Sequence, residues 1–157
     1  MDKINSKLGY CVDSSFFINL KNNAPINHYH SVWNKIKEYI DKGLFISPQP
    51  VLEEIRKRSD DLKEWINSNK NGMFTPVDDL LGIVKEITKN YKGLIDSTSD
   101  IEQADPYVIA LAIKSRKNVL TCESKMNKVN IPYVCEQMKI PCVKKLGQFY
   151  YVESWNI

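Results

Sequence analysis

Histidine is nearly absent from this chain of 157 residues, and the two that occur, His28 and His30, share one polar stretch. An H-x-H pair can bind a metal, but without further ligands nearby we expect both in a surface loop before a helix. Chemistry that depends on a histidine base is therefore disfavoured. The four cysteines form no C-x-x-C pair, so we expect free thiols in a reducing compartment rather than a zinc or redox site.

Glycine and long apolar runs are also scarce. The six glycines spell neither G-x-G-x-x-G nor G-x-x-x-x-G-K-[ST], which argues against a nucleotide-binding loop. No apolar run reaches the length of a membrane span or a signal peptide, so we expect a cytoplasmic protein without a membrane partner. A composition of 43% hydrophobic and 26% charged residues suits a single globular domain over 1–157. The net charge of +3 is compatible with a polyanionic partner but does not establish one.

Apolar residues that are present alternate between strand-like and helix-like spacing. We expect strands at 10–12, 44–47, 118–123 and 141–146, and helices at 31–43, 50–70, 77–91, 105–117 and 131–140. The tail at 147–157 is either an edge strand or a packing arm. Alternating strands and helices predict an α/β fold with a central parallel sheet.

One charged residue interrupts the first apolar stretch, "YCVDSSFFI". Asp13 directly follows the strand at 10–12 and precedes another apolar run. A buried carboxylate is costly unless it is hydrogen-bonded or bound to a cation, so Asp13 needs partners. Ligands of a parallel sheet gather at the carboxyl ends of its strands, so these partners should lie at strand ends and helix starts.

Three further acids occupy such positions. Glu54 lies in the first turn of the helix after the second strand, Asp105 precedes the buried helix, and Glu123 ends the strand at 118–123. Four carboxylates in one crevice would repel each other unless cations neutralise them. Hard oxygen ligands of this kind suit Mg²⁺ or Mn²⁺. We therefore predict a site for one or two of these ions.

Each of the three also has an ordinary structural explanation. Asp105 before a proline is typical of a helix N-cap, Glu54 beside Glu53 could be a solvated acid, and Glu123 could belong to a loop. The choice of Glu54 over its neighbour Glu53 rests only on the apolar residue that follows it. Asp13 is the acid whose apolar flanks leave no such explanation.

Four segments, "CVDSSFFI", "VLEEIRKR", "ADPYVIALA" and "VLTCES", together resemble the motifs of the PIN-domain family, the fold of VapC-type toxins and many RNA-processing nucleases. They occur in family order and span residues 9–146. The resemblance implies a three-layer α/β/α fold around a parallel sheet. It also implies that the catalytic and metal-binding acids are Asp13, Glu54, Asp105 and Glu123.

Two hydroxyl residues also match the family's pattern, and the resemblance implies that both bind the substrate. Ser14 stands where a small hydroxyl residue often follows the first aspartate, and Thr121 matches the hydroxyl residue near the fourth acid. Glu123 departs from the pattern, because many members carry aspartate there. The extra methylene of glutamate can still reach a cation or a metal-held water, but it can weaken a second metal site.

The function implied by the resemblance is a Mg²⁺- or Mn²⁺-dependent endoribonuclease. Its implied partners are an RNA substrate, an antitoxin protein that inhibits it, and a second copy in a homodimer. Basic residues beside the acids would hold the phosphate backbone: Arg56, Lys57, Arg58, Lys125 and Lys128.

Two alternatives come from other classes of protein. An aspartyl-nucleophile phosphatase needs a second aspartate two positions after the first, where this chain has Ser15. A catalytically inactive module of the same fold, which binds RNA or a protein, would carry the acids without assembling a working site. Metal-dependent stabilisation and RNA cleavage distinguish this module from a nuclease.

Overall fold

A five-stranded sheet, all of whose strand pairs are parallel, forms the centre of the fold, with strand order β3-β2-β1-β4-β5. The computed structural model describes residues 4–58, 60–94, 103–123 and 129–156. The strands are β1 (Tyr10–Val12), β2 (Phe45–Pro48), β3 (Phe74–Thr75), β4 (Asn118–Leu120) and β5 (Cys142–Val143). The predicted parallel sheet is therefore confirmed, with one strand more than expected.

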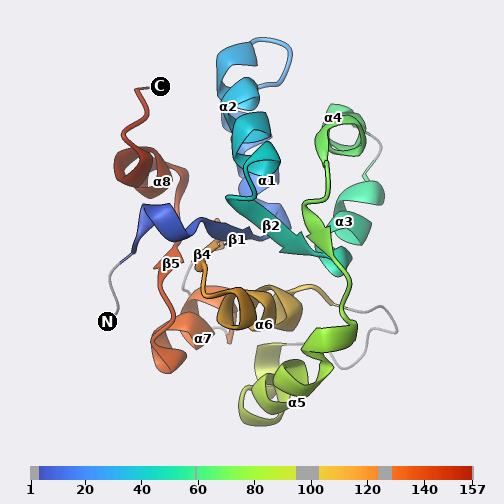
Figure 1. Cartoon of the computed structure of the whole chain (residues 1–157), viewed down its shortest axis with the longest axis vertical. Helices are drawn as coiled ribbons and strands as arrows, with labels where there is room; N and C mark the ends of the chain where they lie inside the picture. The colour runs from blue at the N-terminus through green and yellow to red at the C-terminus, as the bar shows by residue number, and fades with distance from the viewer. Residues whose placement is uncertain (1–3, 59, 95–102, 124–128, 157) are drawn as a thin grey trace.

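Helices cover both faces of this sheet (Figure 1). They are α1 (Ser14–Asn23), α2 (His30–Asp41), α3 (Gln49–Arg56), α4 (Asp61–Asn69), α5 (Leu81–Asn90), α6 (Asp105–Ser115), α7 (Ile131–Met138) and α8 (Leu146–Glu153). Helices α1, α2 and α8 lie on one side of the sheet and α6 and α7 on the other. Helix α5 packs outside α6, while α3 and α4 flank the β3 edge. This arrangement confirms the three-layer α/β/α fold.

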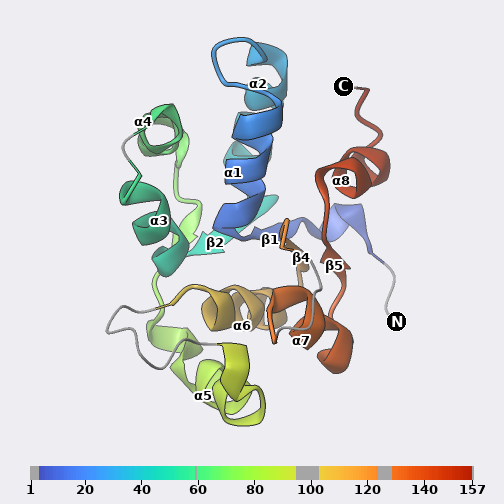
Figure 2. The ribbon, with the colours of Figure 1, turned by 180° about the vertical axis from the view of Figure 1, so that it is seen from behind.

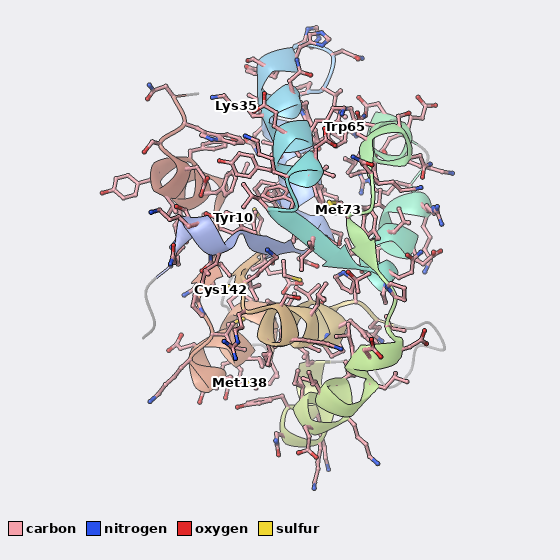
Figure 3. The ribbon with its side chains drawn as sticks, viewed as in Figure 1. Tyr10, Lys35, Trp65, Met73, Met138 and Cys142 are labelled. Carbon is pink, nitrogen blue, oxygen red and sulfur yellow. The ribbon has the colours of Figure 1, made fainter. Side chains whose placement is uncertain are left out.

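The central strand explains why the sheet forms. All three residues of β1 are fully buried, as expected for a parallel strand that is covered on both faces. Helix α6 is apolar around nearly its whole circumference and packs against β1, β2 and β4. The ring of Tyr10 lies between the sheet and α8, 5.3 Å from the ring centre of Phe149 (Figure 3).

Several predicted boundaries were wrong. The single helix expected over 50–70 is two helices, because the chain turns at Asp60, whose carboxylate accepts the Lys63 N–H (3.3 Å) and starts α4. A 3₁₀ turn, Asp78–Leu80, precedes α5. Of the two alternatives for the tail, the structure shows the packing arm, because helix α8 packs its Phe149 into the aromatic core. Strand β3 was not predicted, because two residues carry no alternation that a pattern could detect.

A close backbone approach holds the start of β1. Gly9 has a φ of +78°, and a Cβ there would stand 2.6 Å from the Leu44 carbonyl oxygen. That same oxygen accepts the Tyr10 N–H at 2.7 Å, so the two segments cannot separate without losing this bond. Only glycine fits this position without strain.

Replacement of Gly9 by alanine should therefore destabilise the protein by at least about 1 kcal/mol, because both the conformation and the contact oppose a Cβ. Gly82, an exposed residue of α5 with no atom near its Cβ position, is the matched control. Gly82→Ala should stabilise by up to about 1 kcal/mol. Urea denaturation midpoints of both variants measure the difference. Equal shifts of the two midpoints would contradict this account of β1.

The topology brings the ends of β1, β2 and β4 and the starts of α1, α3 and α6 to the same edge of the sheet (Figure 2). Within the parts of the chain described above, no helix is long and apolar enough to cross a membrane.

Candidate active site

Asp13 lies at the end of β1, where its backbone N–H donates to the Leu120 carbonyl (2.9 Å) and continues the pairing with β4. The side chain is buried, with 2% of its surface exposed. Its Oδ2 accepts hydrogen bonds from the Ser15 hydroxyl (2.6 Å) and the Thr121 hydroxyl (3.1 Å). Burial raises the pKa of Asp13, and these hydroxyl groups oppose that rise.

Ser15 organises this end of the sheet, although sequence reasoning gave it no place in the site. Its hydroxyl donates to Asp13 and accepts the Cys122 N–H (2.9 Å), and it stands 3.0 Å from the Thr121 hydroxyl. The available signal in the sequence was a serine two positions after Asp13. In the structure, this serine positions the Asp13 carboxylate.

Glu54 extends from α3 toward the start of α1. Its Oε1 accepts a hydrogen bond from the Ser14 hydroxyl (3.2 Å). Partial burial of the carboxyl group and the negative charge of Asp13 raise the pKa of Glu54 to about 7. The residue as a whole still has substantial exposed surface, so solvent screens part of this effect.

The neighbouring Glu53 points to a different side of α3. It is exposed, and its carboxylate accepts from the Gln49 amide (3.1 Å) and the Arg56 guanidinium (3.4 Å). Of the two glutamates, Glu54 is therefore the one that bonds to Ser14, the residue next to Asp13, and whose pKa the charge of Asp13 raises.

Asp105 is the first residue of α6, and the N-cap position belongs to Ala104. The expectation that Asp105 could be an ordinary N-cap is therefore wrong. Burial raises the pKa of Asp105 to about 9, and the negative charges of Asp13, Glu123 and Glu54 add to the rise. Asp105 thus lies within electrostatic reach of all three other predicted acids.

Glu123 follows β4 and is half-buried. Its N–H donates to the Thr121 hydroxyl (3.2 Å), and its carboxylate accepts the Ile131 N–H (3.3 Å) at the start of α7. The side chain therefore bridges β4 and α7 while its charge acts on Asp105.

Thr121 joins these groups, because its hydroxyl contacts Asp13, Ser15 and the Glu123 N–H. Thr121→Val keeps the shape of the side chain but leaves buried polar groups with fewer partners, so we expect a loss of about 1–3 kcal/mol in unfolding free energy. Thr88→Val is the control, because the Thr88 hydroxyl bonds to carbonyls of its own helix. This substitution should change the unfolding free energy by less than about 0.5 kcal/mol. Equal losses in urea denaturation would show that the Thr121 network adds nothing.

The predicted basic residues lie at the end of α3, with different partners. Arg58 donates to the Asp60 carboxylate (2.8 Å), which also pairs with Lys21 (3.0 Å). Arg56 is exposed, and among the residues that the structure describes its ion pair is the long contact with Glu53 noted above. Lys57 is the cation whose charge acts on Glu54, where it opposes the rise in pKa.

The outcome for the remaining predicted residues differs. Lys125 and Lys128 lie outside the described residues. His28 is in the α1–α2 connection and His30 begins α2, and both are exposed, as expected of a surface segment.

The described side chains at this edge of the sheet include suitable donor atoms for a metal ion, but their present positions do not form a metal site. Carboxylate oxygens from four segments, supported by hydroxyl groups, form the donor set that Mg²⁺ and Mn²⁺ prefer. Within the described ranges, however, no three His, Cys, Asp or Glu side chains stand close enough together to hold a metal ion. Ser14 and the Ile131 N–H each hold one glutamate, so those side chains would have to turn toward a cation.

A comparison with protein-family models matches residues 10–156 to a family described as "Domain of unknown function (DUF4411)". This match includes the four acids and every strand of the sheet. No curated protein matches the chain.

Proposed function

We propose that this chain, which belongs to the DUF4411 family, is a divalent-metal-dependent endoribonuclease of the PIN-domain type. The observation that carries the proposal is the electrostatic coupling of Asp105 to Asp13, Glu54 and Glu123. These acids come from four separate segments: Asp13 and Glu123 follow β1 and β4, Asp105 begins α6, and Glu54 lies in the second turn of α3, not in its first turn as the sequence predicted. Clustered acids whose ionisation is mutually unfavourable are typical of functional sites.

The acids would hold one or two Mg²⁺ or Mn²⁺ ions. A bound divalent cation lowers the pKa of a water ligand and neutralises the charge that develops on a phosphodiester during hydrolysis. The hydroxyl groups of Ser15 and Thr121 fix the Asp13 carboxylate in place. Without a cation, Asp105, whose pKa is about 9, is protonated at neutral pH, and Glu54, whose pKa is about 7, is about half protonated.

Hydrolysis of a phosphate diester by these residues fits better than phosphoryl transfer to an aspartate. Aspartyl-nucleophile chemistry requires an acid two residues after Asp13. Ser15 occupies that position, and its hydroxyl donates to Asp13 rather than acting as a second carboxylate. The arrangement favours a site that binds cations over one that forms an acyl phosphate.

RNA as the substrate is part of the proposal and rests on the PIN-domain resemblance. The same resemblance supports a role as the toxin of a toxin–antitoxin pair, with an antitoxin protein and a second copy of this chain as partners. The catalytically inactive RNA- or protein-binding module remains the competing proposal, supported by the absence of a preformed metal-ligand group among the described side chains.

Cleavage mapping on total RNA tests the function. Wild-type protein with Mg²⁺ or Mn²⁺ should produce discrete new 5′ ends that disappear with EDTA and with Asp13→Asn. Glu86→Gln, which changes an exposed acid of α5, should cut as wild type does. RNA that is bound but remains uncut with either ion would support the inactive module instead.

A further inference from the structure

A pocket of about 220 Å³ lies on the other side of α3 from the acids. Helix α3 lines it with Gln49, Leu52 and Arg56, and the segment from the end of α4 to β3 lines it with Lys70, Gly72 and Phe74. In Figure 3, the label of Met73 marks this segment as it enters β3.

The helical repeat explains why the pocket and the acids are separate. Positions 49, 52 and 56 recur at three- and four-residue intervals and so share one face of α3, while Glu54 lies on the opposite face. Arg56 in the pocket is followed by Lys57, whose charge reaches Glu54. Positive charge therefore runs around the end of α3 from the pocket to the acids.

The cations of this pocket are available to an anion. Among the residues that the structure describes, Lys70 has no carboxylate partner. Arg56 has only the 3.4 Å contact with Glu53, and both side chains are well exposed, so this ion pair is weak. The geometry leaves both positive groups free to bind phosphate.

The remaining lining suits a base. Phe74 is half-buried and contributes an aromatic ring, and Gln49 carries an amide that can both donate and accept hydrogen bonds. A Cβ at Gly72 would meet no atom within 4 Å, so the space beside this residue is open. Cations beside an aromatic ring are typical of surfaces that bind single-stranded nucleic acid.

We infer that this pocket binds one nucleotide of single-stranded RNA, close to the bond that the acids cleave. Arg56 and Lys70 hold its phosphate, Phe74 stacks on its base, and Gln49 bonds to the edge of the base. The inference rests on the proposed nuclease function and names the residues that position its substrate. A strand that crosses the end of α3 occupies the pocket and the acid cluster together.

Glu53 is a residue whose substitution should strengthen RNA binding rather than weaken it. Its carboxylate accepts from both Gln49 and Arg56, the two residues of α3 that the nucleotide would use. RNA must displace this carboxylate before it binds. Glu53→Gln should therefore tighten RNA binding, because it removes a negative charge from the rim of the pocket.

Fluorescence anisotropy with a labelled eight-nucleotide single-stranded RNA tests this, on an Asp13→Asn background that does not cleave. Arg56→Ala, Lys70→Ala and Phe74→Leu should each raise Kd about fivefold or more, and Glu53→Gln should lower it about twofold or more. Lys85→Ala, which removes an exposed lysine from α5, is the control for net charge. An effect of Lys70→Ala no larger than that of the control would overturn the inference, as would unchanged binding by Glu53→Gln.

Two further arms identify the ligand. Uridine monophosphate should compete with the labelled RNA only at much higher concentration than the unlabelled strand. An acidic leucine-rich peptide should not compete at all, and competition by it would assign the pocket to a protein partner instead.

Kinetics separates this inference from the proposed function. With Asp13 restored, the pocket variants should raise KM for RNA cleavage and leave kcat near the wild-type value. Cleavage with unchanged KM would refute the pocket alone. RNA binding that depends on the pocket, in a protein that never cleaves, would refute the nuclease alone.

Discussion

Asp105→Asn should reduce metal-dependent RNA cleavage by more than about a hundredfold and yet raise the unfolding temperature of the metal-free protein. The first effect follows from the proposed role of Asp105 as a metal ligand, since removal of the outer partners of a metal alone costs about 10- to 100-fold. The second follows because burial, reinforced by the charges of the other acids, makes the ionised Asp105 carboxyl group unfavourable in the folded protein. Asparagine cannot ionise and keeps the size of the side chain.

This opposite response distinguishes a functional acid from a structural one. If Asp105 served only to start α6, its replacement would lower stability and leave any cleavage intact. Cleavage assays and thermal unfolding in EDTA, on the same protein preparation, measure both effects. Glu86→Gln, which replaces an exposed acid of α5, is the control and should alter neither the cleavage rate nor the unfolding temperature.

The metal-free protein should lose stability as the pH rises from 5 to 9, and Mn²⁺ should restore it. Glu54 and Asp105 have folded-state pKa values of about 7 and 9, above the ordinary values near 4 that carboxyls have in an unfolded chain. Between these limits the folded state binds more protons than the unfolded state. The stability that these two groups contribute is therefore fully present below pH 4, and it is lost as the pH rises through their folded-state pKa values.

The size of both effects is measurable by thermal unfolding. We expect the unfolding temperature in EDTA to fall by on the order of 5 °C between pH 5 and pH 9. At pH 8, Mn²⁺ at about a hundred times its Kd should raise the temperature by roughly 5–10 °C through mass action. Asp105→Asn should flatten the pH dependence and remove most of the response to Mn²⁺. A wild-type unfolding temperature that rises with pH in EDTA would contradict the assigned cluster.

The placement of the acids was predictable because few arrangements of an α/β chain are possible. Asp13 follows an unmistakably buried strand, and Asp105 begins a helix that is apolar on all sides. A parallel sheet brings such positions to one edge, whatever the loops between them do. Local sequence was therefore sufficient to place the backbone of the site.

Side-chain directions were not predictable in the same way. The choice between Glu53 and Glu54 depends on which face of α3 meets α1, and that is set by packing between distant segments. The role of Ser15 depends on the Thr121 and Cys122 groups of another strand end. Lys70 carries no local signal either, because its pocket forms only when β3 pairs with β2.

The aromatic tail, for which the sequence left an edge strand and a packing arm open, was undecided for a related reason. Its alternating aromatics are compatible with a strand, but Phe149 is buried in the aromatic core while Tyr151 is 86% exposed, because residues two positions apart in a helix point to nearly opposite sides. Glu153 then accepts hydrogen bonds from the hydroxyls of Tyr10 and Tyr39. These contacts join the end of the chain to β1 and α2, and tertiary packing overrides the local pattern.

A crystal structure of the wild-type protein grown with Mn²⁺ would test most directly whether the chain gathers its carboxylates to bind a divalent ion. An anomalous difference peak about 2.0–2.2 Å from oxygens of Asp13 and Asp105, with Glu54 or Glu123 turned toward it, is the expected result. An empty cluster at millimolar Mn²⁺, or a peak bound only by surface residues elsewhere, would contradict it.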